Sequence, residues 1–167
     1  MMILPKLAPK FVMPVLAAAI AACSPQAAEQ VPEQTAMATE NVHPISGLEI
    51  IPVTVTTSTG THVIQAELAD TIEAQQRGLM FRNEMGPDEG MIFPYEEPEV
   101  LSFWMRNTVL PLDLIFIDEN RTVINIGDGI PYNEVSVVAD REGIAVLELI
   151  AGRSEELGIA PGDSVEW

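Results

Sequence analysis

Short stretches of alternating hydrophobic and polar residues dominate the chain from residue 48 onward, and such alternation predicts β-strands. The expected strands cover residues 49–57, 62–69, 91–95, 100–106, 112–118, 122–126, 144–150 and 164–167. Two short helices are predicted as well, over Ile72–Arg77 and Ala151–Leu157. The first follows a capping box formed by Asp70 and Glu73. The pattern therefore predicts a mainly β fold, a single compact β-sandwich or flattened barrel with two short helices.

Two of the predicted strands are apolar on both faces, as expected for strands in the middle of a fold. They cover residues 112–118 and 144–150, and each carries one carboxylate, Asp113 in the first and Glu148 in the second. A buried carboxylate without a partner is very unfavourable. Each must therefore be paired, hydrogen-bonded or turned toward a cleft.

The N-terminus has the features of an export signal. Residues 1–22 combine two lysines with an apolar run that is shorter than the roughly 20 residues of a membrane-spanning helix, which predicts a signal peptide. The sequence Ile20-Ala21-Ala22-Cys23 resembles the lipobox of bacterial lipoproteins, in which the cysteine is lipidated and becomes the mature N-terminus. By the same resemblance, Ser24 favours the outer membrane over the inner membrane. An ordinary secretory signal followed by an incidental cysteine is the alternative.

Residues 23–47 are rich in proline, glutamine, alanine, glutamate and threonine and lack hydrophobic periodicity. This composition buries too little apolar surface to offset the entropy of ordering, which predicts a flexible tether. His43 falls in the tether and is therefore a poor candidate for a site. The expected organisation is a signal peptide, a tether that starts at the lipidated Cys23, and a β-domain over residues 48–167. The expected location is the periplasmic face of the bacterial cell envelope, where Cys23 anchors the protein to the membrane.

The chain is strongly acidic, with a formal net charge of −17 at pH 7. Such a surface repels the phosphates of nucleic acids, which excludes a nucleic-acid partner. Cys23 is the single cysteine, so an intramolecular disulfide cannot form. The sequence has no phosphate-binding glycine loop, GxSxG motif or zinc-ligand spacing, so neither a cofactor nor a metal is predicted. A catalytic triad would depend on His62 alone, which disfavours the common hydrolase mechanisms.

Six sequence blocks occur in order along the predicted β-domain. They are RGLMFR (77–82), DEGMIF (88–93), SFWMRNT (102–108), PLDLIFID (111–118), VLEL (146–149) and GIAPGDSV (158–165). Together, over about residues 53–167, they resemble the bacterial and archaeal family called domain of unknown function 192. The resemblance implies a compact, mainly β domain that is commonly exported, and it implies no established activity. The chain departs from the family at Arg106, where lysine is frequent, and at Met85, where leucine is more usual.

Candidate chemistry gathers around the stretch from Phe103 to Asp118. The candidate ligand-binding residues are Arg82, Trp104, Arg106, Asn107, Asp113 and Glu148. Alternation along the predicted strand puts Trp104 and Arg106 on one face, next to Asn107. We expect Trp104 to form an apolar wall while Arg106 and Asn107 orient a polar or anionic group of a ligand.

Three interpretations of these residues remain open. The sequence favours a non-enzymatic envelope domain that binds a small molecule, a glycan or a protein partner. In the second interpretation, Asp113 and Glu148 form the acid/base pair of a hydrolase that acts on envelope polysaccharide. In the third, the protein is a structural or assembly accessory without a pocket, and Arg106 closes an ion pair with a carboxylate.

Overall fold

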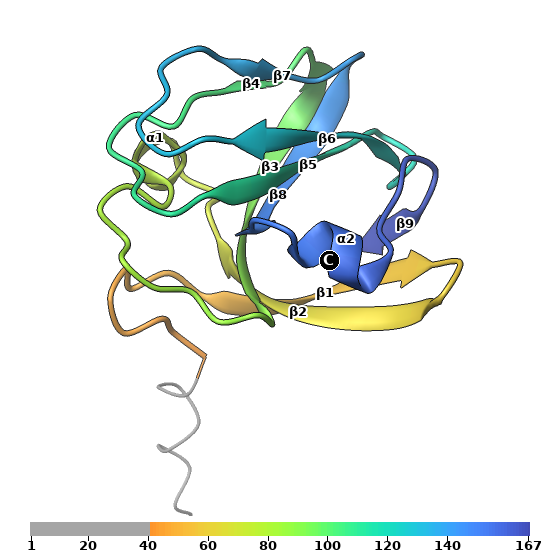
Figure 1. Ribbon diagram of the computed structural model, residues 1–167, viewed down its shortest axis with the longest axis horizontal. Helices are drawn as coiled ribbons and strands as arrows, with labels where there is room; N and C mark the ends of the chain where they lie inside the picture. The colour runs from red at the N-terminus through yellow and green to blue at the C-terminus, as the bar shows by residue number, and fades with distance from the viewer. Residues whose placement is uncertain (1–40) are drawn as a thin grey trace, which may run out of the picture. The chain divides into compact units, whose positions relative to one another are not determined.

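The computed structural model describes residues 41–167, which form a mainly β unit with two short helices, as the hydrophobic pattern predicts (Figure 1). The strands are β1 (Ile50–Thr57), β2 (Gly60–Leu68), β3 (Glu89–Glu99), β4 (Ser102–Phe103), β5 (Leu112–Ile117), β6 (Val123–Gly129), β7 (Val137–Val138), β8 (Gly143–Ile150) and β9 (Ser164–Glu166). The helices are α1 (Ile72–Arg77) and α2 (Arg153–Leu157). The fold class expected from the sequence is therefore confirmed.

Seven strands form one sheet in the order β6-β5-β8-β3-β2-β1-β9, and β4 pairs with β7 in a separate two-stranded ribbon. Strands β2 and β3 run parallel and are joined by the crossover that contains α1, whereas the other neighbours in the large sheet are antiparallel. The sheet curves until its two edges meet at one point, where Thr122 next to β6 bridges Ser164 of β9. This single bridge does not close the sheet into a barrel.

The sheet carries a hydrophobic core on each face. The inner core joins residues of distant strands, such as Ile64 of β2 and Leu147 of β8, because the sheet curves around it; Leu157 of α2 completes it. The outer core lies on the opposite face of β3, β5 and β8, where the crossover contributes Leu79 and the start of the β4–β7 ribbon contributes Leu101. Strand β5 lies between the two cores and is buried at each of its six positions, which explains its unbroken apolar pattern.

The structure corrects the strand predicted over residues 100–106. Only the two residues of β4 are extended and paired there. Beyond them the backbone N–H of Met105 donates to the carbonyl of Asn133 at 2.8 Å, and Asn107 takes the left-handed conformation with a φ of 56°. Asparagine tolerates this conformation better than most residues, and the chain turns there.

Residues 41–47 were expected to belong to the tether, yet they pack against the β-domain. Val42 forms a bridge with Glu49, and the N–H of His43 donates to the carbonyl of Leu48 at 2.8 Å. The folded unit therefore includes residues 41–47 and does not begin at residue 48, where the sequence predicts its start. Cys23, the predicted signal peptide and the rest of the tether lie outside the described residues. Among residues 41–167, no helix combines the length and the hydrophobicity needed to cross a membrane.

Asp113 of β5 fixes the start of α2. Its carboxylate accepts hydrogen bonds from the backbone N–H of Gly152 at 3.1 Å and of Ser154 at 2.8 Å, and from the Ser154 hydroxyl at 2.6 Å. The residue at the helix N-cap is Gly152, which has no side chain to cap the helix. Asp113 supplies the missing acceptor from a different element, so its burial inside an apolar strand is fully compensated.

We expect Asp113→Asn to lower the free energy of unfolding by about 2 kcal/mol, because an amide offers one acceptor atom in place of two and loses the charge. Urea denaturation followed by circular dichroism measures this loss. Asp128→Asn is the matched control, because Asp128 of β6 lies opposite Asp113 of β5 in the sheet but is exposed. Equal stability of both variants would contradict the capping role.

Candidate functional site

A pocket of about 450 Å³ opens on the outer-core side of the sheet. Its volume falls in the range of sites that bind small molecules. Helix α1 and the turn after it form one wall, β4 and the residue after it form another, and β3 and β8 form the floor. The lining residues are Gln75, Gln76, Arg77, Gly78, Leu79, Met80, Phe93, Tyr95, Ser102, Phe103, Trp104, Thr108 and Glu148.

Glu148 supplies the carboxyl group of this pocket. Its neighbours across β8 are Met91 of β3 and Leu114 of β5, both members of the outer core, so its side chain points to the same side. Glu148 is only 5% exposed, and within residues 41–167 its carboxyl group has neither a hydrogen bond nor an ion pair. Burial raises the pKa of Glu148 from 4.5 to about 8, so the group is mostly neutral at pH 7.

Tyr95 of β3 is the second titratable group at the floor. Burial raises the pKa of its hydroxyl above 10.0, and the negative charges of Glu99 and Glu148 raise it further. Tyr95 is thus protonated at neutral pH, as Glu148 is. Each of these groups can donate one hydrogen bond and accept others, so the floor can bind polar atoms of either kind.

Aromatic side chains form much of the pocket wall. Phe93 and Phe103 meet edge to face with their ring centroids 5.1 Å apart, which is a favourable aromatic geometry. Trp104 is 48% exposed, which leaves a large apolar surface at the mouth of the pocket. The guanidinium of Arg106 lies 5.5 Å from the centroid of the Trp104 ring, close enough for a cation–π interaction.

Two hydrogen bonds to backbone carbonyls hold the parts of the pocket together. The side-chain amide of Gln75 donates to the carbonyl of Pro94 at 2.8 Å and ties α1 to β3. The N–H of Phe81 donates to the carbonyl of Asn107 at 2.9 Å and ties the turn after α1 to the turn after Trp104. These contacts help to fix the shape of the pocket.

The structure separates the residues that the sequence groups into one site. Trp104 and Glu148 both line the pocket. Arg106 stacks on Trp104 from outside the lining, and Asn107 supports the wall through its backbone and through a 3.9 Å contact of its amide with the sulfur of Met80. Within residues 41–167, Arg106 forms no ion pair with a carboxylate, because it is exposed while both candidate carboxylates are buried.

Asp113 and Glu148 cannot serve as an acid/base pair. Across β5 and β8, Asp113 pairs with Leu149 and Glu148 pairs with Leu114. Since successive side chains alternate between faces, the two carboxylates point to opposite faces of the sheet. Asp113 reaches α2 while Glu148 reaches the pocket. A two-carboxylate hydrolase mechanism therefore has no geometric basis here.

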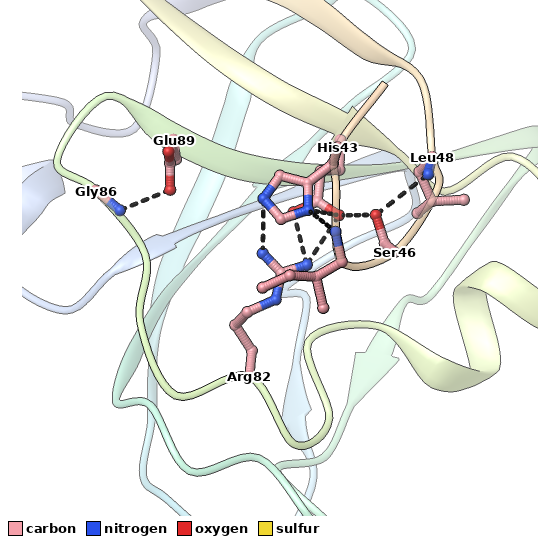
Figure 2. A network of polar contacts seen from close by, with 8 residues as sticks. His43, Ser46, Leu48, Arg82, Gly86 and Glu89 are labelled. Atoms are coloured by element: carbon pink, nitrogen blue, oxygen red, sulfur yellow. Dashed lines mark hydrogen bonds and ion pairs between the residues drawn. The ribbon is translucent and has the colours of Figure 1, made fainter. Parts of the chain in front are cut away.

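Arg82 belongs to a different network (Figure 2). Its guanidinium lies 2.9 Å from the carboxylate of Glu67, and both side chains are buried. His43 contacts the same guanidinium at 3.2 Å, and the Ser46 hydroxyl donates to Glu67. Figure 2 shows His43 and Ser46 reaching this ion pair from the segment that precedes β1. The network fastens residues 41–47 to the domain.

Sequence reasoning missed several residues that line the pocket. Tyr95 was placed in a strand but not in a site, although it shares a face with Phe93 by alternation. Gln75 and Arg77 were assigned to a helix without a functional role. The pairing of β3 with β8 and the position of the crossover bring all three residues to the pocket. Local sequence patterns predict neither of these long-range features. No group of three potential metal-ligating side chains comes together anywhere between residues 41 and 167.

Comparisons with known proteins identify the family of the chain and support its fold. A protein of unknown function from Novosphingobium aromaticivorans DSM 12444 is 53% identical and superposes with a TM-score of 0.74, covering 75% of this chain and 91% of its own. A candidate transcription regulator from Sinorhizobium meliloti 1021 is 37% identical with a TM-score of 0.69, covering 71% of this chain and 94% of its own. A search of curated proteins gives no match. The sequence model of the family DUF192, described as Uncharacterized ACR, matches residues 53–167, and the chain belongs to this family.

Proposed function

We propose that this protein is a lipid-anchored binding protein of the bacterial cell envelope, whose β-domain captures a small molecule in the pocket between Trp104 and Glu148. Cys23 within its lipobox supports the anchor, and Ser24 favours the outer membrane. The observation that carries the binding function is the Glu148 carboxyl group, which is buried at the pocket and has no partner among the described residues.

The energetic cost of Glu148 supports this proposal. A rise in pKa from 4.5 to about 8 corresponds to about 5 kcal/mol of destabilisation once the group is ionised, at 1.36 kcal/mol for each unit. Asp113 and Glu67 are equally buried, but each is compensated by donors of the protein. Glu148 has no such compensation within the described residues, so it has no evident structural role. A ligand that donates to this carboxyl group would offset the cost.

Binding fits the pocket better than catalysis does. Among residues 41–167, Glu148 is the only carboxylic acid that lines the pocket, and no histidine of this range lines it. The pocket therefore offers recognition groups and an apolar wall, without the paired acid and base that hydrolysis needs. The Sinorhizobium meliloti relative is described as a transcription regulator. We do not propose this role for the present chain, because its net charge of −17 opposes binding to DNA.

Trp104→Ala should abolish ligand capture and leave the fold intact, because the side chain is 48% exposed. A thermal-shift screen against sugars, organic amines and organic acids identifies compounds that raise the melting temperature of the wild-type protein. Those shifts should disappear in Trp104→Ala while its melting temperature without ligand changes little. Ile72→Ala is the control, since Ile72 is an exposed residue of α1 outside the pocket lining. If no compound gives a Trp104-dependent shift, the accessory interpretation replaces this one.

Glu148→Gln should raise the free energy of unfolding above that of the wild type, and by more at high pH than at low pH. Because the unfolded chain loses this proton near pH 4.5 and the folded protein keeps it to about pH 8, the folded state binds more protons between these values, and stability falls as pH rises. The variant lacks this loss. The free energy of unfolding of the variant minus that of the wild type should therefore increase by about 4 kcal/mol from pH 5 to pH 9. Urea denaturation at both pH values measures the difference. The exposed Glu97 provides the control variant Glu97→Gln, and an equal pH response in both variants would refute the assignment.

Cys23→Ala should move the protein from the membrane fraction to the soluble fraction, because the thiol that accepts the lipid is lost. Cell fractionation followed by immunoblotting measures the distribution. Ser24→Asp is the matched control: it should stay membrane-bound and move from the outer to the inner membrane. A wild-type protein found in the soluble fraction would contradict the proposed lipid anchor and would not bear on the proposed binding function of the pocket.

A further inference from the structure

We infer that the ligand of this pocket carries an organic ammonium group, which pairs with Glu148 at the floor while the aromatic side chains surround its carbon chain. This inference rests on the proposed binding function and names the chemical class of the ligand. It follows from three features of the pocket: the unpartnered carboxyl group, the aromatic lining and the position of the arginines.

The carboxyl group at the floor lacks a cation. A buried carboxylate is stabilised by a nearby positive charge, and residues 41–167 place no ion-pair partner at Glu148. Of the two arginines near the pocket, Arg77 is exposed at the end of α1, and Arg106 lies against the Trp104 ring. Neither forms an ion pair with Glu148. The ligand is left to supply the positive charge.

The lining also suits a cation. Phe93, Tyr95, Phe103 and Trp104 all line the pocket, in a chain that has only two tryptophans, two tyrosines and five phenylalanines. Aromatic faces attract ammonium groups, and the attraction is strongest where water is excluded. The net charge of −17 further raises the local concentration of cations around the protein.

The arginines fix the direction in which the ligand enters. Both arginines are exposed whereas Glu148 is buried, so an ammonium group is attracted to Glu148 and repelled at the mouth. The opposite end of the ligand, which faces Arg77 and Arg106, is therefore neutral or acidic. A neutral glycan would use the Trp104 face but would leave the floor carboxyl group without a charged partner.

This class of ligand has a characteristic pH dependence. The polar groups that line the pocket together with Glu148 are Tyr95 of β3, the hydroxyl groups of Ser102 and Thr108, and Gln75, Gln76 and Arg77 of α1. The neighbour of Glu148 on β5 is the apolar Leu114. Tyr95 keeps its proton throughout the range considered, because its pKa is raised above 10.0. Binding of a cation must therefore expel the Glu148 proton, so affinity rises about tenfold for each pH unit up to about pH 8 and is constant above it.

Isothermal titration calorimetry with n-butylamine, 1-butanol and N-acetylglucosamine tests the inference. n-Butylamine resembles a lysine side chain and stays charged below about pH 9, and 1-butanol is its neutral counterpart. We expect the amine to bind at least about tenfold more tightly than the alcohol, and its affinity to rise about fiftyfold from pH 6 to pH 8. Titrations in buffers of different ionisation enthalpy should detect close to one proton released at pH 6, a readout that needs no variant.

The variants separate failure of the inference from failure of the proposed function. Glu148→Gln should lose the pH dependence and at least about tenfold of the amine affinity, while Glu97→Gln should lose neither. Amine binding that survives Glu148→Gln, or that releases no proton in the wild type, overturns the inference. Trp104-dependent binding of N-acetylglucosamine without amine binding overturns the inference and keeps the proposed function. If none of the probes binds and the wider screen also fails, both are overturned.

Discussion

The burial of β5 and β8 on both faces is the constraint from which the rest of this structure follows. A strand enclosed by two cores has no solvent face, so every polar side chain on it must enter one core or the other. Asp113 and Glu148 occupy positions that differ by one residue in register across these strands. That offset sends Asp113 toward α2 and Glu148 toward the pocket. One residue of register thus separates a structural carboxylate from a candidate binding group.

Three of the four buried carboxylates among residues 41–167 meet the same physical demand in different ways. Asp113 accepts hydrogen bonds from the start of α2, and Glu67 pairs with Arg82 while accepting a hydrogen bond from Ser46. Glu148 is as buried as either, yet in the described part of the chain it has no donor. The first two residues hold elements together, α2 in one case and residues 41–47 in the other. Since the protein compensates two such groups completely, the uncompensated third is informative about function.

The sequence was sufficient to predict the elements and to identify the carboxylates that need explanation. The bounds of strand β5 and helix α1 were predicted almost to the residue, because an apolar run and a helix start are local signals. The predicted capping box was wrong: the N-cap of α1 is Thr71 rather than Asp70, and its hydroxyl accepts a hydrogen bond from the N–H of Ala74 at 3.2 Å. Which strands pair and in which register is decided by contacts between distant residues, so local patterns could not reveal that Asp113 and Glu148 diverge. The strand predicted through Trp104 was wrong beyond Phe103 for the same reason, since the hydrogen bond from Met105 to Asn133 is a distant contact.

The position of the pocket is a consequence of topology rather than of any one motif. Because β2 and β3 run parallel, the chain must cross over between them, and the crossover carries α1 onto the outer face of the sheet. The β4–β7 ribbon covers the same face from the other side and contributes Phe103 to the outer core. Each cover is held to the sheet or to the other by specific contacts, such as those of Gln75 and Phe81. The space left between the two covers lies over β8, and Glu148 is the residue of β8 that lines it. A fold that covers one sheet face with two separate segments thus creates a site at their junction, and the polar residue beneath that junction determines what the site can bind.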